Sequence, residues 1–542
     1  MVTRRLPSLP LQVALLAALA VVVRAIHLGS APAEFDEFYH ILAARSWLAE
    51  GTFAVGGGEY SRSSLFTLLV AGSMRLLGDG LAAARIPSVL AGVAWVVAMF
   101  LWTRKVAGTT AAWIGGIVFS LDPGVVHLSQ LARFYTLHGL AVWLGAVGIY
   151  RLVREDMSRP RVRLVVVGVV VAWVLALHLQ VTTLAALAAV CGWLAAALGP
   201  RLRAMLSRDR RAVIVAIVIV GVALVGLAYG FADGTLARLW LKYQVTPSWA
   251  EQTAGEPRYY AWWLEGRYPI LWALFPAAVV VALVTAGPPA AFATTVFAIS
   301  FLVQSLGAAK NERYLYYAFP FFLAVWSFAL ATAFSGLRRL LDELLLRVRG
   351  LERRVRLRSA ATGAATAGIF LFAYRTSPAV SMTADMLRAE PGKRPYAQPD
   401  YASAAPKLRL LTDSADVVVT TAMVKSLYYL DRGDVALSRT VLSDLARPHM
   451  PPDFFVDPRT GRPVITEPAS LERVYECYRT GLVLVEAHHL RTPWIMPAAT
   501  ARFLETRLEE VTLQPAWGLR AFKWRRASLL NGDHCRQIER TR

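Results

Sequence analysis

Residues 9–28 read LPLQVALLAALAVVVRAIHL, and residues 33–40, a few positions further on, read AEFDEFYH. The first stretch is apolar over a length that can cross a bilayer as a helix. The second places two adjacent carboxylates, Asp36 and Glu37, just past that segment and ahead of a half-apolar stretch. Carboxylates at this position, in a chain that is otherwise mostly apolar, indicate a candidate catalytic base on the outer face of a membrane.

The composition of the whole chain is that of a membrane protein. The mean hydropathy is +0.45 and 56% of the 542 residues are hydrophobic, which is too much for a soluble chain of this length. The net charge of +21 could suggest nucleic acid, but the arginines cluster in short loops between apolar runs. The sequence lacks a basic domain with interleaved aromatic residues, so it argues against a nucleic-acid partner.

Apolar runs of membrane-spanning length recur along the chain. We expect about eleven transmembrane helices, each of roughly 17–25 residues, in an α-helical polytopic membrane domain. The expected spans are residues 9–28, 86–103, 110–127, 133–151, 163–179, 181–199, 212–231, 268–286, 288–306, 314–335 and 359–375.

Arginine-rich loops orient these spans. The clusters run from Arg4-Arg5, before the first helix, to residues 338–358, before the last. Under the expected count they all fall on one side, so that side and the N-terminus are predicted to be cytoplasmic. An odd number of helices then places the C-terminal region outside. The alanine- and arginine-rich usage is typical of a bacterium with a GC-rich genome, so we expect a multi-pass protein of the bacterial inner membrane.

Two long outer segments interrupt the membrane domain, residues 1–375. Residues 29–85 carry the acidic pair and two helices, near 38–48 and 65–77, that are expected to lie in the membrane interface. Residues 232–267 are rich in aromatic side chains. Such side chains form either an interfacial belt or a platform for sugar rings or lipid, and the sequence leaves both interpretations open.

The composition changes after about residue 376, where long apolar runs stop. Strands alternating with helices predict a soluble extracytoplasmic α/β domain over residues 376–542. Cys477 and Cys535 both fall in this domain, where a disulfide could form, and the sequence leaves the pairing open. The expected strands are 416–420, 481–486 and one ending at 522–524, and the expected helices are 422–430 and 497–509.

Several short stretches of the membrane domain follow one another in a recognisable order. They resemble the GT-C glycosyltransferases that use polyprenyl-phosphate sugars, especially the protein O-mannosyltransferase and aminoarabinose-transferase branch. One departure lies at Ser63-Ser64, where that family usually has prolines, and it leaves the subfamily and the acceptor open. The stretches are Asp36-Glu37-Phe38-Tyr39 with residues 41–44, residues 60–66, residues 84–92, residues 128–137, and Glu312-Arg313-Tyr314-Leu315 with Phe319-Pro320.

This resemblance implies catalytic roles for the acidic pair. Asp36 would be the general base that deprotonates an acceptor hydroxyl in an inverting transfer. One carboxylate suffices, since a polyprenyl phosphate is already a good leaving group. Glu37 could orient Asp36, bind the acceptor, help hold a metal or be structural. A divalent cation, Mg²⁺ or Mn²⁺, stays open, because some GT-C relatives require one and the acidic pair alone is not a metal site.

Cationic side chains on the same side are expected to hold the departing phosphate. Arg133 is the first choice, since it lies at an outer helix start, and Arg62, Lys310 and Arg313 are further candidates. Arg267 could instead pair with Glu265 and carry no chemistry. The candidate substrate-binding residues are His127, Tyr135 and Tyr39, which could equally be packing or belt residues.

The sequence therefore predicts an integral membrane glycosyltransferase. It would move a sugar from a polyprenyl-phosphate donor, with undecaprenyl or decaprenyl phosphate as the carrier, to an extracytoplasmic glycan, lipid or protein. An arabinofuranosyl- or other pentosyltransferase of cell-wall polysaccharide is an alternative. A lipid or glycan transporter, a flippase or a non-catalytic scaffold would be of another class. The sequence shows no broken-helix pair in matching halves, which argues against transport.

Overall fold

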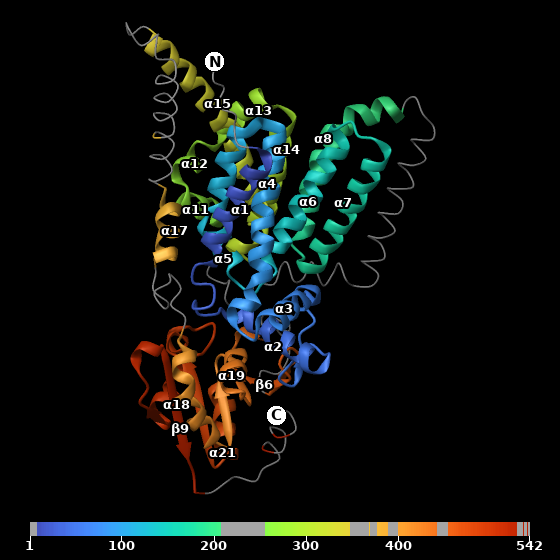
Figure 1. Ribbon diagram of the computed structural model, residues 1–542. Coiled ribbons are helices and arrows are strands. Elements are labelled where there is room, and N and C mark those ends of the chain that lie inside the picture. The colour runs from blue at the N-terminus through green and yellow to red at the C-terminus, as the bar shows by residue number, and fades with distance from the viewer. Residues whose placement is uncertain are drawn as a thin grey trace.

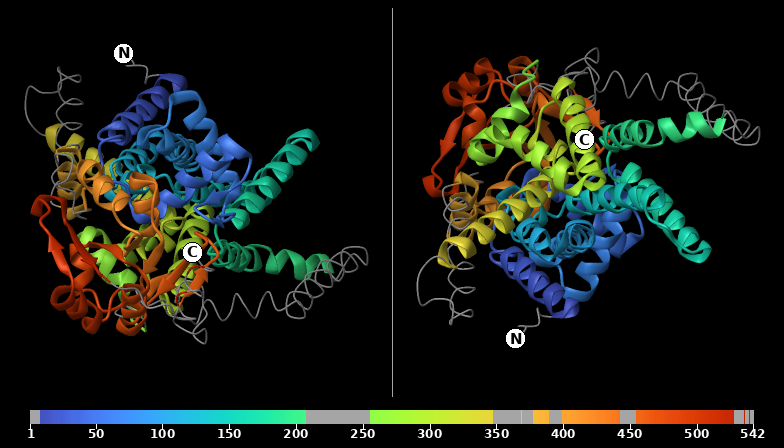
Figure 2. Two further views of the ribbon diagram at one scale, coloured as in Figure 1. Left: turned by 90° about the horizontal axis from the view of Figure 1, so that it is seen from below. Right: turned by 90° about the horizontal axis from the view of Figure 1, so that it is seen from above.

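The computed structural model describes residues 8–206, 255–346, 377–388, 399–441 and 454–527, together with Gly368, Cys535 and Glu539. Long helices stand side by side in one layer, shown at the top of Figure 1. A mixed sheet with its own helices lies at the opposite end, and α2 and α3 lie between the two layers (Figure 1). Figure 2 shows the molecule from the sheet end and from the helical end.

The helical layer is built from apolar helices. Within the described residues, five helices are long and apolar enough to cross a membrane: Leu81–Ser120, Tyr135–Arg154, Arg159–Leu179, Pro288–Leu306 and Phe319–Leu340. The layer comprises α1 (Leu9–Ala25), α4 (Leu81–Ser120), α6 (Tyr135–Arg154), α7 (Arg159–Leu179), α8 (Thr183–Leu206), α13 (Phe275–Ala286), α14 (Pro288–Leu306) and α15 (Phe319–Leu346).

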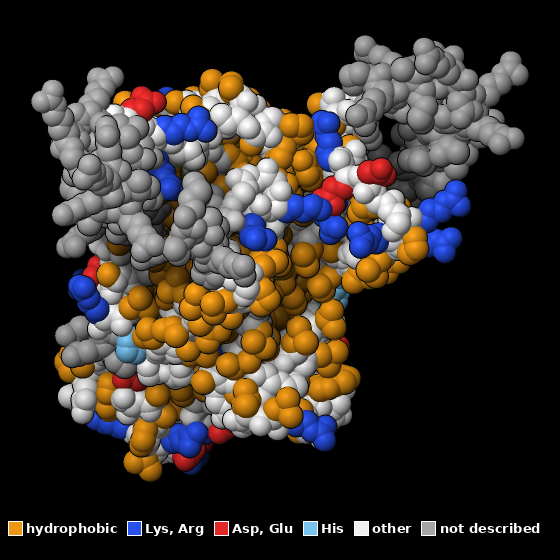
Figure 3. Space-filling model, turned by 45° about the horizontal axis from the view of Figure 1, so that its top comes forward, with side chains coloured by type: hydrophobic (Ala, Val, Ile, Leu, Met, Phe, Trp, Pro, Cys, Tyr) orange, Lys and Arg blue, Asp and Glu red, His pale blue; other side chains and the backbone are white. Residues whose placement is uncertain are grey.

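The outward faces of these helices are apolar. On α7, the side chains of Leu164, Val167, Val171 and Val174 are all exposed. Figure 3 shows hydrophobic side chains over much of the described surface on one face, with groups of Lys and Arg beside them. A helix that keeps apolar residues on its exposed side is suited to lipid rather than water.

Helix breaks modify the predicted spans. The break in α4 at Gly108, which has a φ of +86°, falls between predicted spans 86–103 and 110–127 and agrees with them, whereas the second span ends earlier than predicted, at Ser120. Predicted span 268–286 is divided into α12 (Pro269–Ala273) and α13. Predicted span 212–231, and 359–375 apart from Gly368, lie outside the described residues. The count of eleven spans therefore stays a prediction.

The first outer segment folds as two helices joined by a short hairpin. Helix α2 (Phe35–Glu50) and α3 (Ser64–Leu77) contain the two predicted interfacial helices. Strands β1 (Ala54–Val55) and β2 (Gly58–Glu59) pair antiparallel between them. Further along the chain, the described part of the second outer segment contributes α11 (Tyr259–Arg267).

The C-terminal region forms a seven-stranded sheet in the order β5-β6-β4-β3-β7-β9-β8. Strands β6, β4, β3 and β7 are parallel, and β5, β9 and β8 are antiparallel additions. The strands are β3 (Val417–Thr420), β4 (Val435–Leu437), β5 (Phe455–Asp457), β6 (Arg462–Ile465), β7 (Thr480–Glu486), β8 (Glu509–Val511) and β9 (Leu519–Arg525). The helices beside this sheet are α18 (Tyr401–Asp413), α19 (Met423–Leu430), α21 (Pro468–Cys477) and α22 (Ala498–Arg507). Helix α17 (Pro378–Arg388), which falls within the predicted soluble domain, packs instead on the helical layer beside α11, where the Thr383 hydroxyl donates to the Leu121 carbonyl at 2.6 Å (Figure 1).

These elements agree with the α/β pattern expected for this region. The predicted strands correspond to β3, β7 and β9, and the predicted helices to α19 and α22. The core is made of alternating inward residues such as Val417, Val419 and Val483. Cys477 and Cys535 form a disulfide, with their Cα atoms 5.3 Å apart, which answers the question the sequence left open.

The sheet region packs directly on the helix that carries the acidic pair. Phe38 of α2 lies 4.9 Å from Tyr428 of α19, measured between ring centroids. The Gly57 N–H of the hairpin donates to the Thr460 carbonyl at 2.9 Å. The guanidinium of Arg459 lies 5.3 Å from the ring centroid of Tyr39, another residue of α2. The position of α2 is therefore set from the C-terminal side as well as from the membrane side.

The hairpin approaches the backbone at Gly461 so closely that position 58 requires glycine. A Cβ added at Gly58 would lie 2.4 Å from the Gly461 nitrogen, a backbone atom that cannot rotate away. We expect Gly58→Ala to destabilise this contact by about 1–3 kcal/mol, the usual cost of overpacking. The measurement is the thermal unfolding midpoint of the detergent-solubilised chain.

A matched control is available in the neighbouring helix. A Cβ added at Gly72 of α3 meets nothing within 4 Å. Gly72→Ala should therefore leave the midpoint unchanged or raise it, since alanine favours a helix interior by about 0.5–1 kcal/mol. Equal destabilisation by the two substitutions would show that the hairpin contact does not hold the sheet region to α2.

Candidate active site

Asp36 lies in the first turn of α2, where the helix dipole favours a negative charge. Its Oδ2 accepts a hydrogen bond from Arg313 Nη1 at 3.0 Å and lies 3.4 Å from Arg133 Nη2. The side chain is 32% exposed. Among the described residues, no hydrogen bond reaches its Oδ1, so this oxygen is available to a hydroxyl from outside.

Arg133 is held from several directions. Its Nη1 donates to the Asp36 backbone carbonyl at 3.1 Å and to the Tyr60 hydroxyl at 3.3 Å. Its Nη2 donates to the Tyr135 hydroxyl at 3.2 Å. The side chain is only 3% exposed, whereas that of Arg313 is 24% exposed. Of the two arginines that face Asp36, Arg313 is therefore the one a ligand reaches more easily.

The charge state of Asp36 follows from these neighbours. Burial alone would raise the pKa of its carboxyl, but Arg133, Arg313 and Arg62 outweigh burial and hold the pKa well below its usual range. The carboxylate is therefore ionised at neutral pH, as a base must be before it accepts a proton.

Glu37 is adjacent in sequence but faces the other way. Its carboxylate is fully buried and forms a bidentate pair with Arg85, at 2.8 Å from Nε and 2.9 Å from Nη2. It also accepts the backbone N–H groups of Glu34 and Ala132. Arg85 in turn donates to the Leu28 and Ala31 carbonyls. This placement favours a positioning role for Glu37, at the join of α2, α4 and the preceding loop, over direct contact with substrate.

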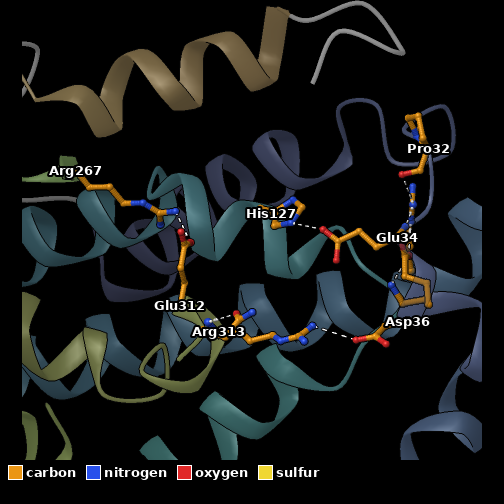
Figure 4. A network of polar contacts seen from close by, with 11 residues as sticks. Pro32, Glu34, Asp36, His127, Arg267, Glu312 and Arg313 are labelled. Carbon is orange, nitrogen blue, oxygen red and sulfur yellow. Dashed lines mark hydrogen bonds and ion pairs between the residues drawn. The ribbon is translucent and has the colours of Figure 1, made fainter. Parts of the chain in front are cut away.

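A cavity of about 330 Å³ opens next to Asp36. This volume is within the range of small-molecule pockets, about 300–1,000 Å³. Arg313 lines the cavity and also pairs with Asp36, so the two features adjoin (Figure 4). The other lining residues are Pro32, Glu34, Pro123, Gly124, His127, Leu128, Leu131, Tyr135, Tyr259, Arg267, Asn311, Glu312, Tyr316, Met382 and Met386.

Polar pairs line two sides of this cavity. His127 Nε2 lies 2.8 Å from Glu34 Oε1, and both side chains are partly exposed. Arg267 Nη2 donates to Glu312 Oε2 at 2.5 Å. Figure 4 shows both pairs and the Arg313–Asp36 pair together, contributed by segments far apart in sequence. Arg267, which the sequence allowed to pair with Glu265, pairs instead with Glu312.

The buried carboxylate of Asp122 connects two segments that line the cavity. Asp122 caps α5 (Pro123–Ser129) by accepting the Val125 N–H at 2.7 Å. It also accepts the Tyr268 hydroxyl at 2.6 Å and the Tyr316 hydroxyl at 3.3 Å. Asp122 thereby ties α5, which carries His127, to the segment that carries Arg313.

Of the other predicted residues, some line the cavity and some pack around it. Tyr135 and His127 line it, as expected. Arg62 contributes to the field on Asp36 and donates to Gln180 at 3.0 Å. Tyr39 is buried and stacks on Tyr60, 4.8 Å between ring centroids, so it packs under the site rather than in it.

Lys310 has a different role from its neighbour Arg313. It is buried, and its ammonium donates to the carbonyls of Gln304, Ser305 and Gly307 at the C-terminal end of α14. An ammonium has three donors, and all three are used here. The structure therefore places Lys310 as a helix cap, not as a ligand that faces the cavity.

The backbone conformation at Ser63 excludes the proline that the resembling family usually has at this position. Ser63 has a φ of +53°, and its hydroxyl donates to the Leu179 carbonyl at 2.9 Å. Proline is fixed near a φ of about −65° and could not adopt this conformation. This turn joins the first outer segment to the end of α7, next to the Arg62–Gln180 contact.

Comparison with known proteins gives the fold. No protein-family model matches the chain, and no curated protein matches it in sequence. Among solved structures, ArnT from Cupriavidus metallidurans bound to undecaprenyl phosphate is similar, with a TM-score of 0.62 and 15% identity. The match covers 95% of this chain and 98% of ArnT. The chain has the GT-C fold.

A second structure shares the GT-C fold at lower similarity. This is the archaeal oligosaccharyltransferase AglB from Archaeoglobus fulgidus in complex with an inhibitory peptide and a dolichol-phosphate. The TM-score is 0.53 and the identity 11%, over 89% of this chain and 71% of AglB. The fold implied by the sequence resemblance, that of a helical membrane protein with a C-terminal sheet region, is thereby confirmed.

Of the residues that line the cavity, the sequence predicts Arg313, His127 and Tyr135 as binding residues. Glu34, Arg267, Asn311, Glu312 and Tyr316 were not singled out as binding residues. Two of them stood within stretches that the sequence had marked, since Glu34 precedes Asp36 by two positions and Glu312 precedes Arg313.

Proposed function

We propose that this protein is a membrane glycosyltransferase that moves a sugar from a polyprenyl-phosphate donor to an acceptor hydroxyl or similar group. The observation that supports this most is the placement of Asp36, a partly exposed carboxylate held by two arginines beside a small-molecule cavity. A base and a cationic phosphate site lie side by side, as transfer from a lipid phosphate requires. In this proposal the protein lies in a bacterial inner membrane with the site on the outer face.

In the proposed reaction, Asp36 Oδ1 accepts the proton of the acceptor as its oxygen attacks the anomeric carbon. The bond from that carbon to the phosphate oxygen breaks, and the polyprenyl phosphate leaves with the electron pair. Attack from the face opposite the leaving group inverts the anomeric configuration. A single carboxylate is enough, because the leaving group is an anion of low basicity and needs no acid.

The arginines carry the charge that develops on the leaving phosphate. Arg313 faces the cavity and offers a guanidinium fork that suits a phosphate. Arg133 is buried and holds the Asp36 backbone, so we assign it to positioning and to the local field. Glu34, His127 and Glu312 line the cavity and are suited to hydrogen bonds with sugar hydroxyls.

Donor binding would also activate the base. A carboxylate with a very low pKa is a weak base, and proton transfer works best when the pKa is near the working pH. A phosphate beside Arg313 would partly neutralise that arginine and lessen the attraction that lowers the pKa of Asp36. Asp36 therefore becomes more basic only when the donor is present, which protects the enzyme from acting on one substrate alone.

A divalent cation does not fit beside Asp36. The guanidinium groups of Arg133 and Arg313 already approach Oδ2, at 3.4 and 3.0 Å. A doubly charged ion at this carboxylate would be repelled by both of them. We therefore propose that the arginines provide the positive charge that a metal ion would supply in a site made of carboxylates without arginines.

The sugar and the acceptor are identified by a transfer assay. Purified full-length protein in lipid is incubated with a panel of polyprenyl phosphates, each carrying a different radiolabelled sugar, and with a membrane extract as acceptor. We expect release of polyprenyl phosphate and label in the acceptor for one donor. A folded protein that releases polyprenyl phosphate from no donor would contradict the proposal and favour a transporter or a non-catalytic role.

The pH dependence tests the pairing of Arg313 with Asp36. Removing the guanidinium in Arg313→Gln takes away a cation that lowers the pKa of Asp36, so that pKa rises. The base is then protonated, and the turnover rate falls, at a higher pH than in the wild type. The measurement is kcat/KM for the donor against pH, which reports the enzyme before the donor binds, with Arg75→Gln, an exposed arginine of α3, as control. Superimposable acid limbs in wild type and Arg313→Gln would refute the coupling.

A further inference from the structure

The C-terminal sheet contains a strand arrangement that commonly binds ligands. From β3, the chain continues through α19 to β4 on one side, and it later returns through α21 to β7 on the other side. Parallel strands that diverge in this way leave a crevice beyond their carboxyl ends. Thr420 ends β3, and Glu486 ends β7, so both stand at this crevice.

Three potential metal ligands meet at this point. Glu486 is the last residue of β7, and His488 and His489 follow in the short helix η4 (Ala487–Arg491). One ligand atom from each lies within 4.8 Å of the others. His489 Nε2 and His488 Nε2 lie 3.4 and 3.8 Å from Glu486 Oε2.

These distances suit a shared ion better than direct hydrogen bonds. Hydrogen bonds from N–H to oxygen are about 2.7–3.2 Å long. Tetrahedral ligands at about 2.0–2.2 Å from a zinc ion lie about 3.3–3.6 Å from one another. The separations at Glu486 are longer than hydrogen bonds and close to the distances between ligands of one ion.

Outer contacts orient the ligands as metal sites require. Thr421 Oγ1 lies 2.9 Å from His489 Nδ1, which leaves Nε2 directed toward Glu486 when Nδ1 carries the proton. The Thr421 hydroxyl also accepts the Glu486 backbone N–H at 3.2 Å. Lys425 holds the other carboxylate oxygen of Glu486 at 2.9 Å, and both of those side chains are buried. The carboxylate is thereby held with Oε2 toward the histidines.

We infer that Glu486, His488 and His489 form a binding site for a divalent transition metal, of which Zn²⁺ fits best. Two imidazoles and one carboxylate are a known zinc ligand set with three protein ligands and an open fourth position. The side chain of His488 is 57% exposed, so the fourth position is reachable by water or by an anionic group. The site is separate from Asp36 and does not depend on the proposed transfer reaction.

Metal binding is measured on the full-length protein, purified through a tag without histidine and stripped with chelator. Equilibrium dialysis against Zn²⁺ should give one tightly bound ion per chain. Bound Co²⁺ should show the intense visible absorption of a tetrahedral site. His488→Ala removes an exposed ligand without disturbing the core, and it should weaken Zn²⁺ binding by more than the about 10–100-fold that outer-contact changes cost.

The control removes an imidazole elsewhere. His178→Ala, at the end of α7, should bind Zn²⁺ as the wild type does. Thr421→Val, which removes only the orienting hydroxyl, should weaken binding by about 10–100-fold. Failure of the wild type to bind one ion per chain would overturn the inference. Equal affinities of His488→Ala and His178→Ala would overturn it too, because the ion would then lie elsewhere.

Discussion

Replacing Asp36 with asparagine should lower the turnover number for sugar transfer by about 10²–10⁴-fold, the contribution of a positioned general base. The amide has the same shape and can still accept hydrogen bonds from Arg313, but it cannot take the acceptor's proton. The measurement is the initial rate at saturating donor and acceptor, in lipid, with thermal unfolding recorded to confirm that the variant is folded.

A neighbouring carboxylate provides the control. Asp79 belongs to the same outer segment, is exposed and pairs with Arg45 at its Oδ2. Asp79→Asn removes an equal charge from that segment and should retain a near-wild-type rate. A folded Asp36→Asn variant with full activity would remove Asp36 from the mechanism and with it the single-base account.

Breaking the buried Arg85–Glu37 pair should have the largest effect on stability. In Arg85→Met the Glu37 carboxylate stays buried without its partner, and the Leu28 and Ala31 carbonyls lose their donor. Removing one partner of a buried pair costs about 3–5 kcal/mol. We therefore expect a large fall in the thermal midpoint and in the yield of folded protein.

Two further variants separate this effect from a general loss of charge. Replacing both partners, in Arg85→Met with Glu37→Met, should recover much of the loss, since no buried charge is then left alone. Arg45→Met breaks the exposed pair with Asp79 and should cost only about 0–1 kcal/mol. If Arg85→Met were as mild as Arg45→Met, Glu37 would not anchor α2.

Much of the fold was accessible from local sequence patterns. The lengths of the apolar runs predicted α6, α7 and α14, and the alternating pattern of strands and helices predicted β3, α19 and β7. The break at Gly108 lies between two predicted spans, next to Arg104 and Lys105, and was therefore predictable. The break between α12 and α13 was harder to predict, because the sequence around it remains apolar. Hydropathy reports burial in lipid, whereas a break depends on backbone conformation.

The site shows a similar division. Asp36 was recognisable because it follows the first apolar segment within a family-like stretch. Glu37 could have been separated from it, since adjacent residues on a helix point in directions about 100° apart. Lys310 and Arg313 looked equivalent in sequence, but only the fold shows that one caps α14 and the other meets Asp36. The pairs Glu34–His127 and Arg267–Glu312 join segments far apart in sequence, which no local pattern reports.

The most direct test of the account follows the two halves of the donor separately. Lipid-reconstituted protein is given a polyprenyl-phosphate sugar with one radiolabel in the sugar and another in the phosphate, together with the acceptor found in the transfer assay. The account predicts that the sugar label moves to the acceptor with inverted anomeric configuration, while an equal amount of phosphate label stays on the lipid. Both labels moving together, or a product of retained configuration, would contradict it.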